Sequence, residues 1–592
     1  MKTHIILIVW LFIFVITSGF CGDDYHWQSP NTYLQSAILE GDYYDIGYRA
    51  AMLSGITYDQ SMVKHFNKYY DDYFKKLSPN KSLRKILKTY FHYKLIYRMR
   101  KRISNKDKEY IKGVADAFNV SPKLLEKAFI LPDGLHAVVT DGLKVIRSFD
   151  GIKADDKKLH RSLLSRLISC SSFSAHSNKS KKNNRILARN LDYIGQNILD
   201  KGTGVYLIKP KGKYKHIVVS PQGFPIAGIT TMNEKGLVLV THSTFTKSYK
   251  IWGSKPLLSV NRMVIENAKS IEEAWKIYKK YPVFTGWLIH LSDRDETTNV
   301  ARSAVIELNP KGNAISWGKN DYHVLSNHYT TSKAKKNQLE TYTGAEYHNL
   351  TRYFRLKQLV EKSSIDLEKA IEILQDSYSP YSKTEVDFSP SSIRVPDQLN
   401  SVVFMPDELA VYVAEGPAPT SFSNFYKFSF DQMENGREPE LFEPKNKKVT
   451  EAFKSYLKAY AAIVTDKNEL KGEKYLEEAY EKSGDCSYDL IYGAILMGNS
   501  KIDKSHDILL MATECKMHNP QQSAINQFLL GLYYHYIDEH ETAFFYYENA
   551  LNITESIYLK NAILKVSKKE KIDKDVLLDY SSIDIKYMDT IW

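Results

Sequence analysis

The sequence predicts an α+β protein in which helical segments flank a region of mixed strands and helices. Residues 23–169 show mainly helical periodicity, residues 170–435 alternate short β-rich segments with helical ones, and residues 449–592 return to helical patterns. Strands mixed with helices within one region indicate an α/β or α+β domain. The length of 592 residues exceeds what one hydrophobic core usually organises and suits two or three domains.

The composition is that of a soluble globular protein. Apolar residues make up 43% and charged residues 25% of the chain, which excludes a disordered, collagen-like or polytopic membrane protein. There are 81 Lys and Arg against 69 Asp and Glu, so the net charge is +12. Because this excess looks spread along the chain, without a long basic block, we expect no nucleic-acid partner. An affinity for anionic surfaces or acidic substrates is compatible with the charge.

The first 22 residues have the pattern of a secretory signal. Lys2 supplies the positive end, and a run of 12 apolar residues follows at 5–16. That run is shorter than the ~20 residues of a membrane-spanning helix. We therefore predict a signal peptide over 1–22 and an exported protein, periplasmic or extracellular. A lipid anchor on Cys21 ranks second, because Phe20 is bulkier than the residue expected before a lipidated cysteine.

The region 23–169 is predicted to be mainly helical. Amphipathic patterns indicate helices over 58–77, 83–103 and 107–118. Ser121 and Pro122 open a further helix, with serine as the cap and proline in the first turn.

The region 170–435 changes period near Cys170. Segments rich in β-formers and bounded by Gly, Pro, Asn or Asp predict strands over 185–193, 205–209, 216–220, 237–242, 304–308, 401–405 and 409–415. Helical patterns lie between them over 259–268, 271–281, 351–362 and 366–375. A polar stretch with two prolines, 436–448, is interpreted as a linker.

The region 449–592 resembles a tetratricopeptide repeat array. Small and large residues fall at the offsets of one repeat, namely Leu530, Gly531, Tyr534, Ala543, Tyr547 and Ala550. A looser copy contains Gly493, Leu509 and Ala512. The two copies are 38 residues apart rather than the usual ~34. A partner-binding solenoid and a helical cap that protects the neighbouring domain or supports dimerisation are left as equal interpretations.

The chain contains four cysteines, Cys21, Cys170, Cys486 and Cys515, and no CxxC pair. This is neither a disulfide scaffold nor a zinc pattern, and the histidines show no ligand spacing, so no metal is predicted. Export would permit a Cys486–Cys515 disulfide, with two buried helix cysteines as the alternative.

The most informative stretch is a predicted hairpin. Cys170 begins its first strand, a polar turn covers 176–184, and Arg189 and Asp192 lie near the end of the second strand. The hairpin brings this end back beside Cys170, where a guanidinium would favour the thiolate. Strict alternation places Arg189 and Asp192 on opposite faces, so both act at one site only through a bulge or a strand end. The plain alternatives are a buried hydrophobic cysteine and a surface ion pair.

The CSSF segment beginning at Cys170 and the RNLD segment beginning at Arg189 resemble the N-terminal-nucleophile cysteine hydrolases. That superfamily includes choloylglycine (bile salt) hydrolases, penicillin V acylases and acid ceramidases, and the isopenicillin-N (acyl-CoA:6-aminopenicillanate) acyltransferase branch is the most similar. Supporting segments follow the family's order over about 35–430, at 40–48, 111–116, 232–237, 324–329, 351–355, 401–404 and 416–417. Each segment alone is weak, and the set is fairly specific.

The resemblance implies a fold and a mechanism. The fold is a four-layer αββα sandwich of two stacked antiparallel sheets. The precursor would cleave itself between Ser169 and Cys170, and the freed α-amine of Cys170 would act as the base for its own thiol. The thiolate would attack an amide or thioester carbonyl and form an acyl-enzyme. No cofactor is implied, and the segment 23–169 could stay bound as a subunit.

The resemblance also assigns roles to individual residues. Arg189 would orient or activate the thiol, and Asp192 would hold the new α-amine. Asn327 would donate its side-chain N–H to the oxyanion, and Arg352 would stabilise charge near the nucleophile. Further oxyanion or substrate contacts are assigned to His242, Ser243 and Asn233.

The leading hypothesis is an exported cysteine amidohydrolase or acyltransferase with a small-molecule or lipid-like acyl substrate. One alternative is a lipid hydrolase of the phospholipase B-like or ceramidase kind. Another is a non-catalytic secreted adaptor that binds a protein partner, or itself, through 449–592. No HExxH, P-loop, GxSxG or Rossmann pattern points to other chemistry.

Overall fold

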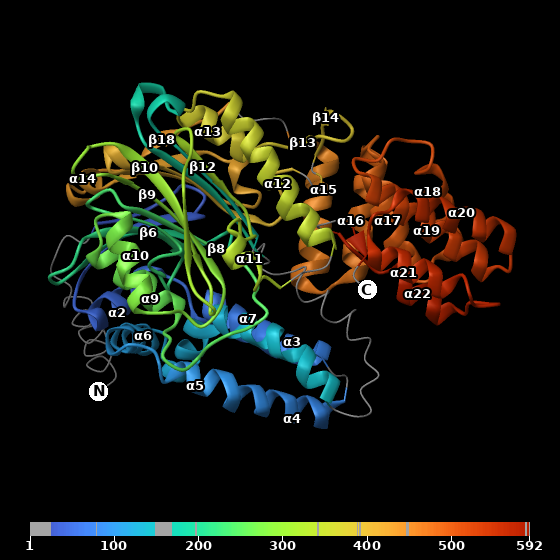
Figure 1. The fold of residues 1–592 in the computed structure, drawn as a ribbon, viewed down its shortest axis with the longest axis horizontal. Helices are drawn as coiled ribbons and strands as arrows, with labels where there is room; N and C mark the ends of the chain where they lie inside the picture. The colour runs from blue at the N-terminus through green and yellow to red at the C-terminus, as the bar shows by residue number, and fades with distance from the viewer. Residues whose placement is uncertain are drawn as a thin grey trace, which may run out of the picture.

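A computed structural model describes residues 25–77, 80–148, 169–193, 195, 198–339, 343–387, 389, 392–445, 449–585 and 589–590 (Figure 1). The predicted signal over 1–22 and Cys21 lie outside the described residues. Among the helices that the structure describes, none combines the length and the apolar character needed to cross a bilayer.

Two large sheets form the centre of the molecule. The nine-stranded sheet contains, in spatial order, β1 (His26–Gln28), β2 (Leu34–Gly41), β5 (Thr203–Pro210), β6 (His216–Pro221), β7 (Thr230–Asn233), β8 (Val238–Ser243), β9 (Trp287–Arg294), β10 (Ala301–Leu308) and β11 (Ala314–Trp317). The seven-stranded sheet contains β12 (Tyr322–Leu325), β3 (Ser169–Ala175), β4 (Ile186–Asp192), β15 (Gln398–Met405), β16 (Ala410–Ala414), β17 (Phe425–Ser429) and β18 (Glu440–Phe442).

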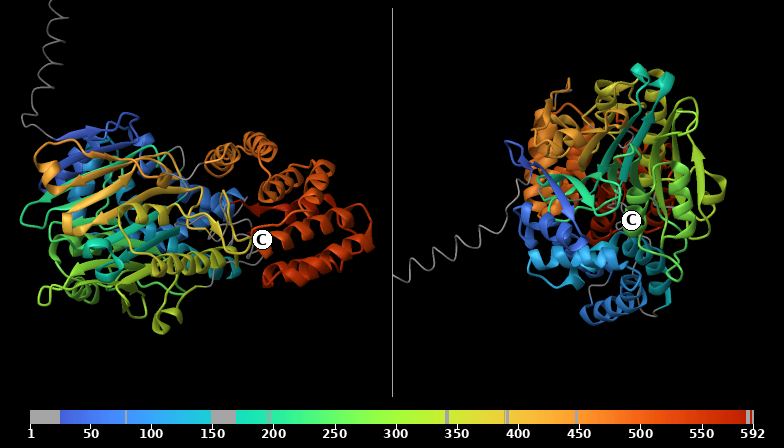
Figure 2. Two further views of the ribbon diagram at one scale, coloured as in Figure 1. Left: turned by 90° about the horizontal axis from the view of Figure 1, so that it is seen from above. Right: turned by 90° about the vertical axis from the view of Figure 1, so that its left-hand side faces the viewer.

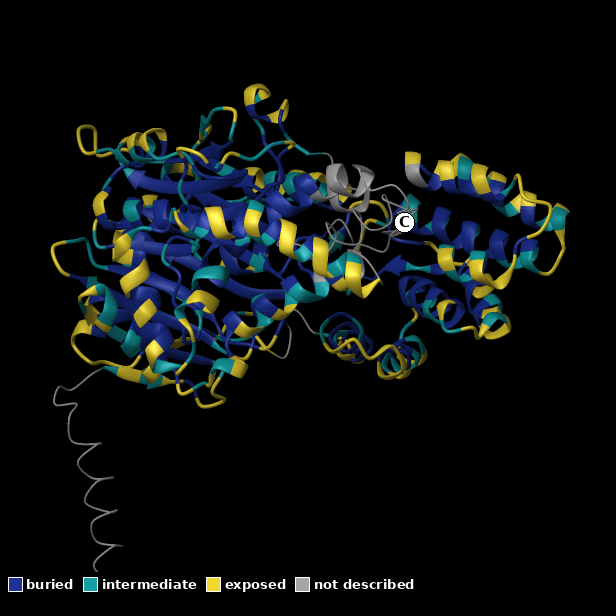
Figure 3. Cartoon of the chain, turned by 90° about the horizontal axis from the view of Figure 1, so that it is seen from below, coloured by how far each residue is buried: buried dark blue, intermediate teal, exposed yellow. Residues whose placement is uncertain are grey.

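The two sheets pack face to face with helices on their outer faces. The inner layer joins apolar side chains of both sheets, such as Leu187 and Phe404 from one and Ile217 from the other. Helices α9 (Leu257–Asn267) and α10 (Ile271–Lys280) cover the nine-stranded sheet. Helices α12 (Thr343–Lys362) and α13 (Leu367–Leu374) cover the seven-stranded sheet. Buried residues accordingly concentrate in the sheets (Figure 3), and the mixed content fits the predicted α+β class.

The nine-stranded sheet departs from the expectation in one pair of strands. β2 and β5 run parallel over eight residues, from Leu34 opposite Thr203 to Gly41 opposite Pro210. The expectation of purely antiparallel sheets is therefore wrong at this pair. Because β2 belongs to 23–169, that region is also not only helical: it contributes two strands to the central sheet. β2 is buried along most of its length and lacks the alternation of a half-exposed strand.

Helices of the segment before Cys170 pack beneath this sheet. They are α2 (Tyr43–Leu53), α3 (Met62–Leu77), α4 (Lys81–Phe91), the π-helical turn η2 (His92–Ile96), α5 (Tyr97–Arg100), α6 (Asn105–Ala117) and α7 (Pro122–Ser148). α2 and α6 approach closely at two glycines, since a Cβ on Gly47 or Gly113 would lie 2.1 Å from a backbone oxygen of the other helix. Their core is shared with residues that follow the nucleophile, such as Tyr206 and Leu258.

The C-terminal helices form a separate lobe beside the sheets (Figure 2). They are α15 (Glu451–Tyr460), α16 (Glu469–Lys482), α17 (Cys486–Gly498), α18 (Ile502–Met511), α19 (Pro520–Tyr536), α20 (His540–Ile553), α21 (Ile557–Val566) and α22 (Lys574–Ser581). Gly493 faces Leu509 and Gly531 faces Tyr547. A Cβ added to Gly493 would lie 2.7 Å from the Leu509 side chain, and one added to Gly531 would lie 2.5 Å from the Tyr547 ring. The small residues thus lie where paired helices touch; the repeat assignment stays a prediction.

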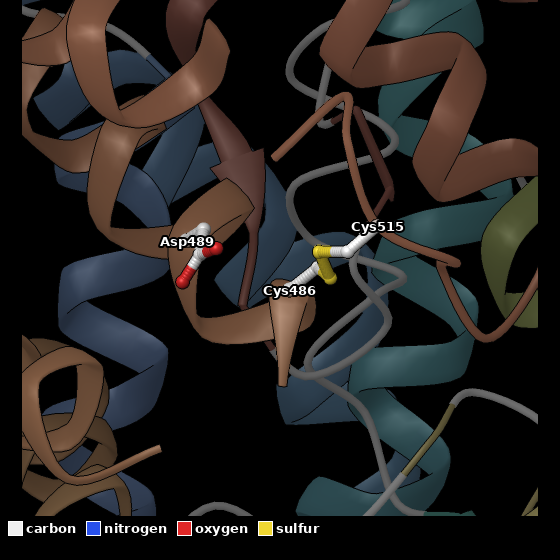
Figure 4. Close-up of side chains that lie close together, drawn as sticks. All are labelled: Cys486, Asp489 and Cys515. Atoms are coloured by element: carbon white, nitrogen blue, oxygen red, sulfur yellow. A yellow bond between two sulfur atoms is a disulfide. The ribbon is translucent and has the colours of Figure 1, made fainter. Parts of the chain in front are cut away.

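The structure decides between the two interpretations of Cys486 and Cys515 and alters the predicted linker that precedes this lobe. Cys486 and Cys515 form a disulfide with Cα atoms 6.3 Å apart, so the alternative of two free helix cysteines is wrong (Figure 4). The carboxyl group of Asp489 lies close to both sulfurs, which the disulfide already uses. Within the predicted linker 436–448, β18 pairs with β17, so the sheet extends further along the chain than expected.

Candidate active site

The predicted hairpin forms as β3 and β4. Its register pairs Ser172 with Arg189, Cys170 with Leu191 and Ser169 with Asp192. The polar turn consists of two short 3₁₀ turns, in which Lys182 and two other residues take positive φ angles. Because β3 and β4 lie inside the seven-stranded sheet, the hairpin brings Arg189 back toward Cys170, as the sequence predicted.

The Cys170 thiol meets the Arg189 guanidinium in the layer between the two sheets. Nη2 of Arg189 lies 3.1 Å from Sγ, and both side chains are fully buried. The guanidinium is held from the facing sheet, since Nη1 donates to the carbonyl oxygen of Ile229 and to Oγ1 of Thr230, each at 2.7 Å. Nη2 also approaches the carbonyl oxygen of Thr241 at 3.4 Å. The cation is thus fixed at the sulfur.

Burial controls the ionisation of this thiol in the uncut chain. It raises the pKa of Cys170 above the ordinary value for cysteine; the Arg189 and Arg352 cations oppose the rise, and Asp192 adds to it. The sequence argument gave the effect of the guanidinium correctly, since Arg189 lowers the pKa of the thiol, but it did not consider burial, which has the larger effect. A buried thiol of this kind needs a nearby base or a further cation before it reacts as a thiolate.

Asp192 lies on the other face of the hairpin. Its Oδ2 accepts a hydrogen bond from Oγ of Ser169 at 3.0 Å and lies 3.9 Å from Nη1 of Arg352. Regular alternation is kept between β3 and β4 through Asp192, the last residue of β4. No bulge brings Arg189 and Asp192 to one face within this hairpin. They instead flank the Ser169–Cys170 segment from its two sides.

Asn327 and Arg352 hold the backbone of Cys170. The Cys170 N–H donates to Oδ1 of Asn327 at 2.7 Å, and Nη1 of Arg352 donates to the Cys170 carbonyl oxygen at 2.6 Å. The two side chains are linked, since Nη2 of Arg352 donates to Oδ1 of Asn327 at 3.1 Å. Nδ2 of Asn327 donates to the carbonyl oxygen of Ser243 at 2.8 Å. In this arrangement the amide N–H is occupied, and the oxyanion role of Asn327 stays a prediction.

The three further residues predicted as oxyanion or substrate contacts, His242, Ser243 and Asn233, have different surroundings. His242 is fully buried, neither ring nitrogen has a hydrogen-bond partner of good geometry, and burial, together with the Arg189 cation, holds its pKa well below the usual value. Ser243 presents its carbonyl to Asn327, while its hydroxyl lies 3.1 Å from Nε2 of His136. Asn233 is not part of the site.

Asn233 instead stabilises the turn between β7 and β8. Its Nδ2 donates to the carbonyl oxygens of Ile265 and Ala268, and its Oδ1 accepts from the N–H groups of Lys235 and Leu237. These four hydrogen bonds use the whole amide, so its assignment as a substrate contact is corrected to a structural role.

Sequence reasoning missed several groups around the thiol. The carbonyl oxygens of Ile229 and Thr241 accept from Arg189, and backbone carbonyls carry no signal in a sequence. Ser172 and Ser174 hold the two ring nitrogens of His290 at 2.9 and 3.1 Å in the same inter-sheet layer. The alternate serines of β3 could have indicated this polar face.

A cavity with a mainly apolar lining borders the site. Leu191, which pairs with Cys170, lines it together with Ile229 and Thr241, whose carbonyls contact Arg189. Met62 and Phe66 of α3 line it from the segment before the nucleophile. The cavity is therefore built jointly by residues on both sides of the Ser169–Cys170 bond.

The comparison with protein families agrees with this chemistry. Residues 179–395 match the model of the family described as acyl-coenzyme A:6-aminopenicillanic acid acyl-transferase. The match contains Arg189, Asp192, Asn327 and Arg352 and begins after Cys170. It supports an enzyme of the acyltransferase branch of N-terminal-nucleophile hydrolases. No curated protein matches the chain.

Proposed function

We propose that the protein is an exported, self-cleaving cysteine hydrolase or acyltransferase that forms its acyl-enzyme on Cys170. The observation that carries this proposal is the 3.1 Å contact between Arg189 and the Cys170 sulfur, with Asp192 and Arg352 across the same strand. The helix–sheet–sheet–helix layering supports the sandwich fold that the resemblance implies. Export rests on the apolar run near the N-terminus.

Maturation would proceed by attack of the thiol on the carbonyl carbon that precedes it. The Cys170 sulfur bonds to the Ser169 carbonyl carbon, the C–N bond breaks, and the thiol proton passes to the departing nitrogen. Water then hydrolyses the thioester, giving a carboxylate on Ser169 and a free thiol with a free α-amine on Cys170. The free thiol and the free α-amine of Cys170 are the two groups that acyl transfer needs.

In the mature enzyme the α-amine would take the thiol proton while the sulfur adds to an acyl carbonyl. The bond to the leaving amine or thiol breaks, the leaving group takes the proton, and water or an acceptor amine then releases the acyl group. Arg189 would stabilise the thiolate, because a fixed cation in a buried site acts with little screening. The fixed donors of the site would stabilise the developing oxyanion.

The segment 23–169 is proposed to remain bound after cleavage. β2 supplies an interior strand of the nine-stranded sheet, and α3 lines the cavity. A buried ion pair between Arg262 of α9 and Asp107 joins the two sides of the cut. A half-buried ion pair between Lys94 and Asp141 lies within the segment itself. Release of this segment would expose its shared core.

The apolar cavity favours an uncharged acyl chain and specifically supports a second candidate function, a lipid amide or ester hydrolase. An apolar lining binds hydrocarbon through burial, at roughly 25 cal/mol per Å² of apolar surface removed from water. Profiling with matched N-acyl amines, ceramides, phospholipids and acyl thioesters separates these substrates.

The deciding experiment is mass spectrometry and N-terminal sequencing of the purified chain. We expect a fragment beginning at Cys170, its absence in Cys170→Ala, and its presence in the control Ser177→Ala in the hairpin turn. A substrate-derived acyl adduct on the Cys170 fragment should accumulate on rapid acid quenching. An uncut wild-type chain with full activity would refute the self-cleavage, and Cys170→Ala with normal activity would refute the nucleophile.

A further inference from the structure

The positive charge of the chain is concentrated at one helix, contrary to the even spread inferred from the sequence. Residues 81–104 contain nine Lys and Arg and neither Asp nor Glu. These residues form α4, the π-helical turn η2 and α5, a nearly continuous helix at the lower edge of the molecule in Figure 1. It lies in the segment before the nucleophile.

One face of this helix is fixed to the protein core. Its buried side chains belong to the core that the preceding segment shares with the sheet, namely Leu87, Phe91, Leu95, Ile96 and Met99. Three cations are anchored by acids of neighbouring helices: Lys88 to Asp71, Lys94 to Asp141 and Arg100 to Glu126. The helix is therefore a rigid element whose outward face is available.

The outward face carries apolar and aromatic side chains in a row. Ile86, Tyr90, Tyr93 and Tyr97 are spaced four, three and four residues apart and are 55, 38, 63 and 42% exposed. That spacing places them along one side of a helix. Trp252, 67% exposed, extends the row, with the Arg102 guanidinium 5.1 Å from its ring centre.

Cations flank this row. Lys81, Lys85, Arg98 and Lys101 are exposed, and the Lys101 ammonium lies 4.4 Å from the ring centre of Tyr97. Tyrosine and tryptophan prefer the headgroup level of a bilayer, and lysine and arginine are attracted to anionic headgroups. A surface that combines both, on a helix whose other face is held by protein, has the character of an interfacial membrane-binding helix.

We propose that this surface, formed by residues 81–102 and Trp252, binds anionic lipid bilayers and makes the protein a peripheral membrane protein. The exposed aliphatic side chain of Ile86 in this row favours a bilayer over a nucleic acid, whose phosphates would contact cations and whose bases would stack on aromatic rings. Lys88 ties this helix to Asp71 on α3, and α3 lines the apolar cavity, so docking would place that cavity near lipid. The inference does not depend on the proposed function.

The test is co-sedimentation of the full-length protein with vesicles of phosphatidylcholine alone or mixed with phosphatidylglycerol. We expect binding only to the mixed vesicles, and at least about a tenfold lower partition coefficient for Lys85→Glu/Lys101→Glu. The matched control is Lys565→Glu/Lys568→Glu, which removes the same charge from two exposed lysines of the C-terminal lobe. Tyr93→Ser/Tyr97→Ser should weaken binding at high salt, where the aromatic contribution dominates.

Equal loss in the charge variant and its control would overturn the proposal, because net charge alone would then explain binding. Equal binding to neutral vesicles, or no binding at all, would also overturn it. A single-stranded RNA that binds the wild type more tightly than the mixed vesicles, and is lost in Lys85→Glu/Lys101→Glu, would assign the surface to nucleic acid instead. Lys81→Gln/Lys85→Gln provides a milder variant if the charge reversal unfolds the helix.

Discussion

Oδ2 of Asp192 accepts a hydrogen bond from Ser169 at the end of the β3–β4 hairpin, while Arg189 contacts the Cys170 sulfur on the opposite face. The two polar groups that the family resemblance assigns to one site therefore lie on opposite faces of one strand, as strand alternation predicts. The Asp192 carboxylate contacts Ser169, on the acyl side of the proposed cut, and the Arg189 guanidinium contacts the nucleophile Cys170. This division allows the two side chains to be tested separately.

Asp192→Asn should slow self-cleavage. The variant keeps the shape of the side chain but loses the charge that accepts from Ser169 and faces Arg352. A hydrogen bond to a charged group contributes about 1.5–3 kcal/mol, which corresponds to a slowing of roughly tenfold to a hundredfold. The rate is measured by gel time course after synthesis. Ser169→Ala, which removes the hydrogen bond and keeps the charge, should have the smaller effect; the reverse order would contradict the role given to the carboxylate.

Arg189→Gln should lower kcat/KM by about a hundredfold to a thousandfold, the usual loss for a charge-stabilising donor in a buried site. Without this cation the pKa of the buried thiol rises further, so less thiolate forms at neutral pH. Arg189→Lys keeps the charge without the planar fork and should retain an intermediate rate. Single-turnover acylation of already cleaved protein is the measurement. Activity of the glutamine variant equal to the wild type would exclude Arg189 from activating the thiol.

Met62→Trp should narrow the apolar cavity from the side of α3. We expect at least about a tenfold lower kcat/KM for long acyl chains and little change for short ones, because each buried methylene contributes about 0.8 kcal/mol. Met52→Trp is the matched control, since Met52 is 49% exposed on α2. Substrates of graded chain length give the measurement. Equal losses at all chain lengths would mean that the cavity does not receive the acyl chain.

Asp133 of α7 should make stability depend on pH in the acid range. Its carboxylate accepts from the Leu257 N–H, from Thr285 and from Trp287, and burial raises its pKa to about 6. The unfolded pKa is about 3.9, so the native state holds a proton that the unfolded chain releases between these values. Native stability from this group is thus full below about pH 4 and falls as pH rises to about 6, by up to about 3 kcal/mol.

The comparison of wild type with Asp133→Asn isolates this effect. Urea unfolding at several pH values from 4 to 7 should show a difference in unfolding free energy that changes with pH, because the asparagine does not titrate. Asparagine also directs an N–H group at one of the three donors. The variant therefore loses some unfolding free energy at every pH, in addition to the pH-dependent difference. A difference that is the same at every pH would show that Asp133 does not titrate in this range.

The sequence predicted the hairpin, its turn and the facing directions of Arg189 and Asp192, because strand alternation is a local property. It did not predict β2 as an interior strand, since parallel pairing with β5 is decided by distant residues. The sign of the Cys170 pKa shift also escaped, because it depends on how much solvent the second sheet excludes. Asn233 was misassigned because the sequence does not distinguish a polar residue that stabilises a turn at a strand end from one that contacts a substrate there.

The parallel alignment of β2 with β5 has a practical consequence for anyone purifying this protein. A nick between Ser169 and Cys170 would leave β2 hydrogen-bonded between the edge strand β1 and β5. Size-exclusion chromatography and affinity capture through either terminus would then recover both pieces together at the mass of an intact chain. A denaturant would be needed to separate the two pieces.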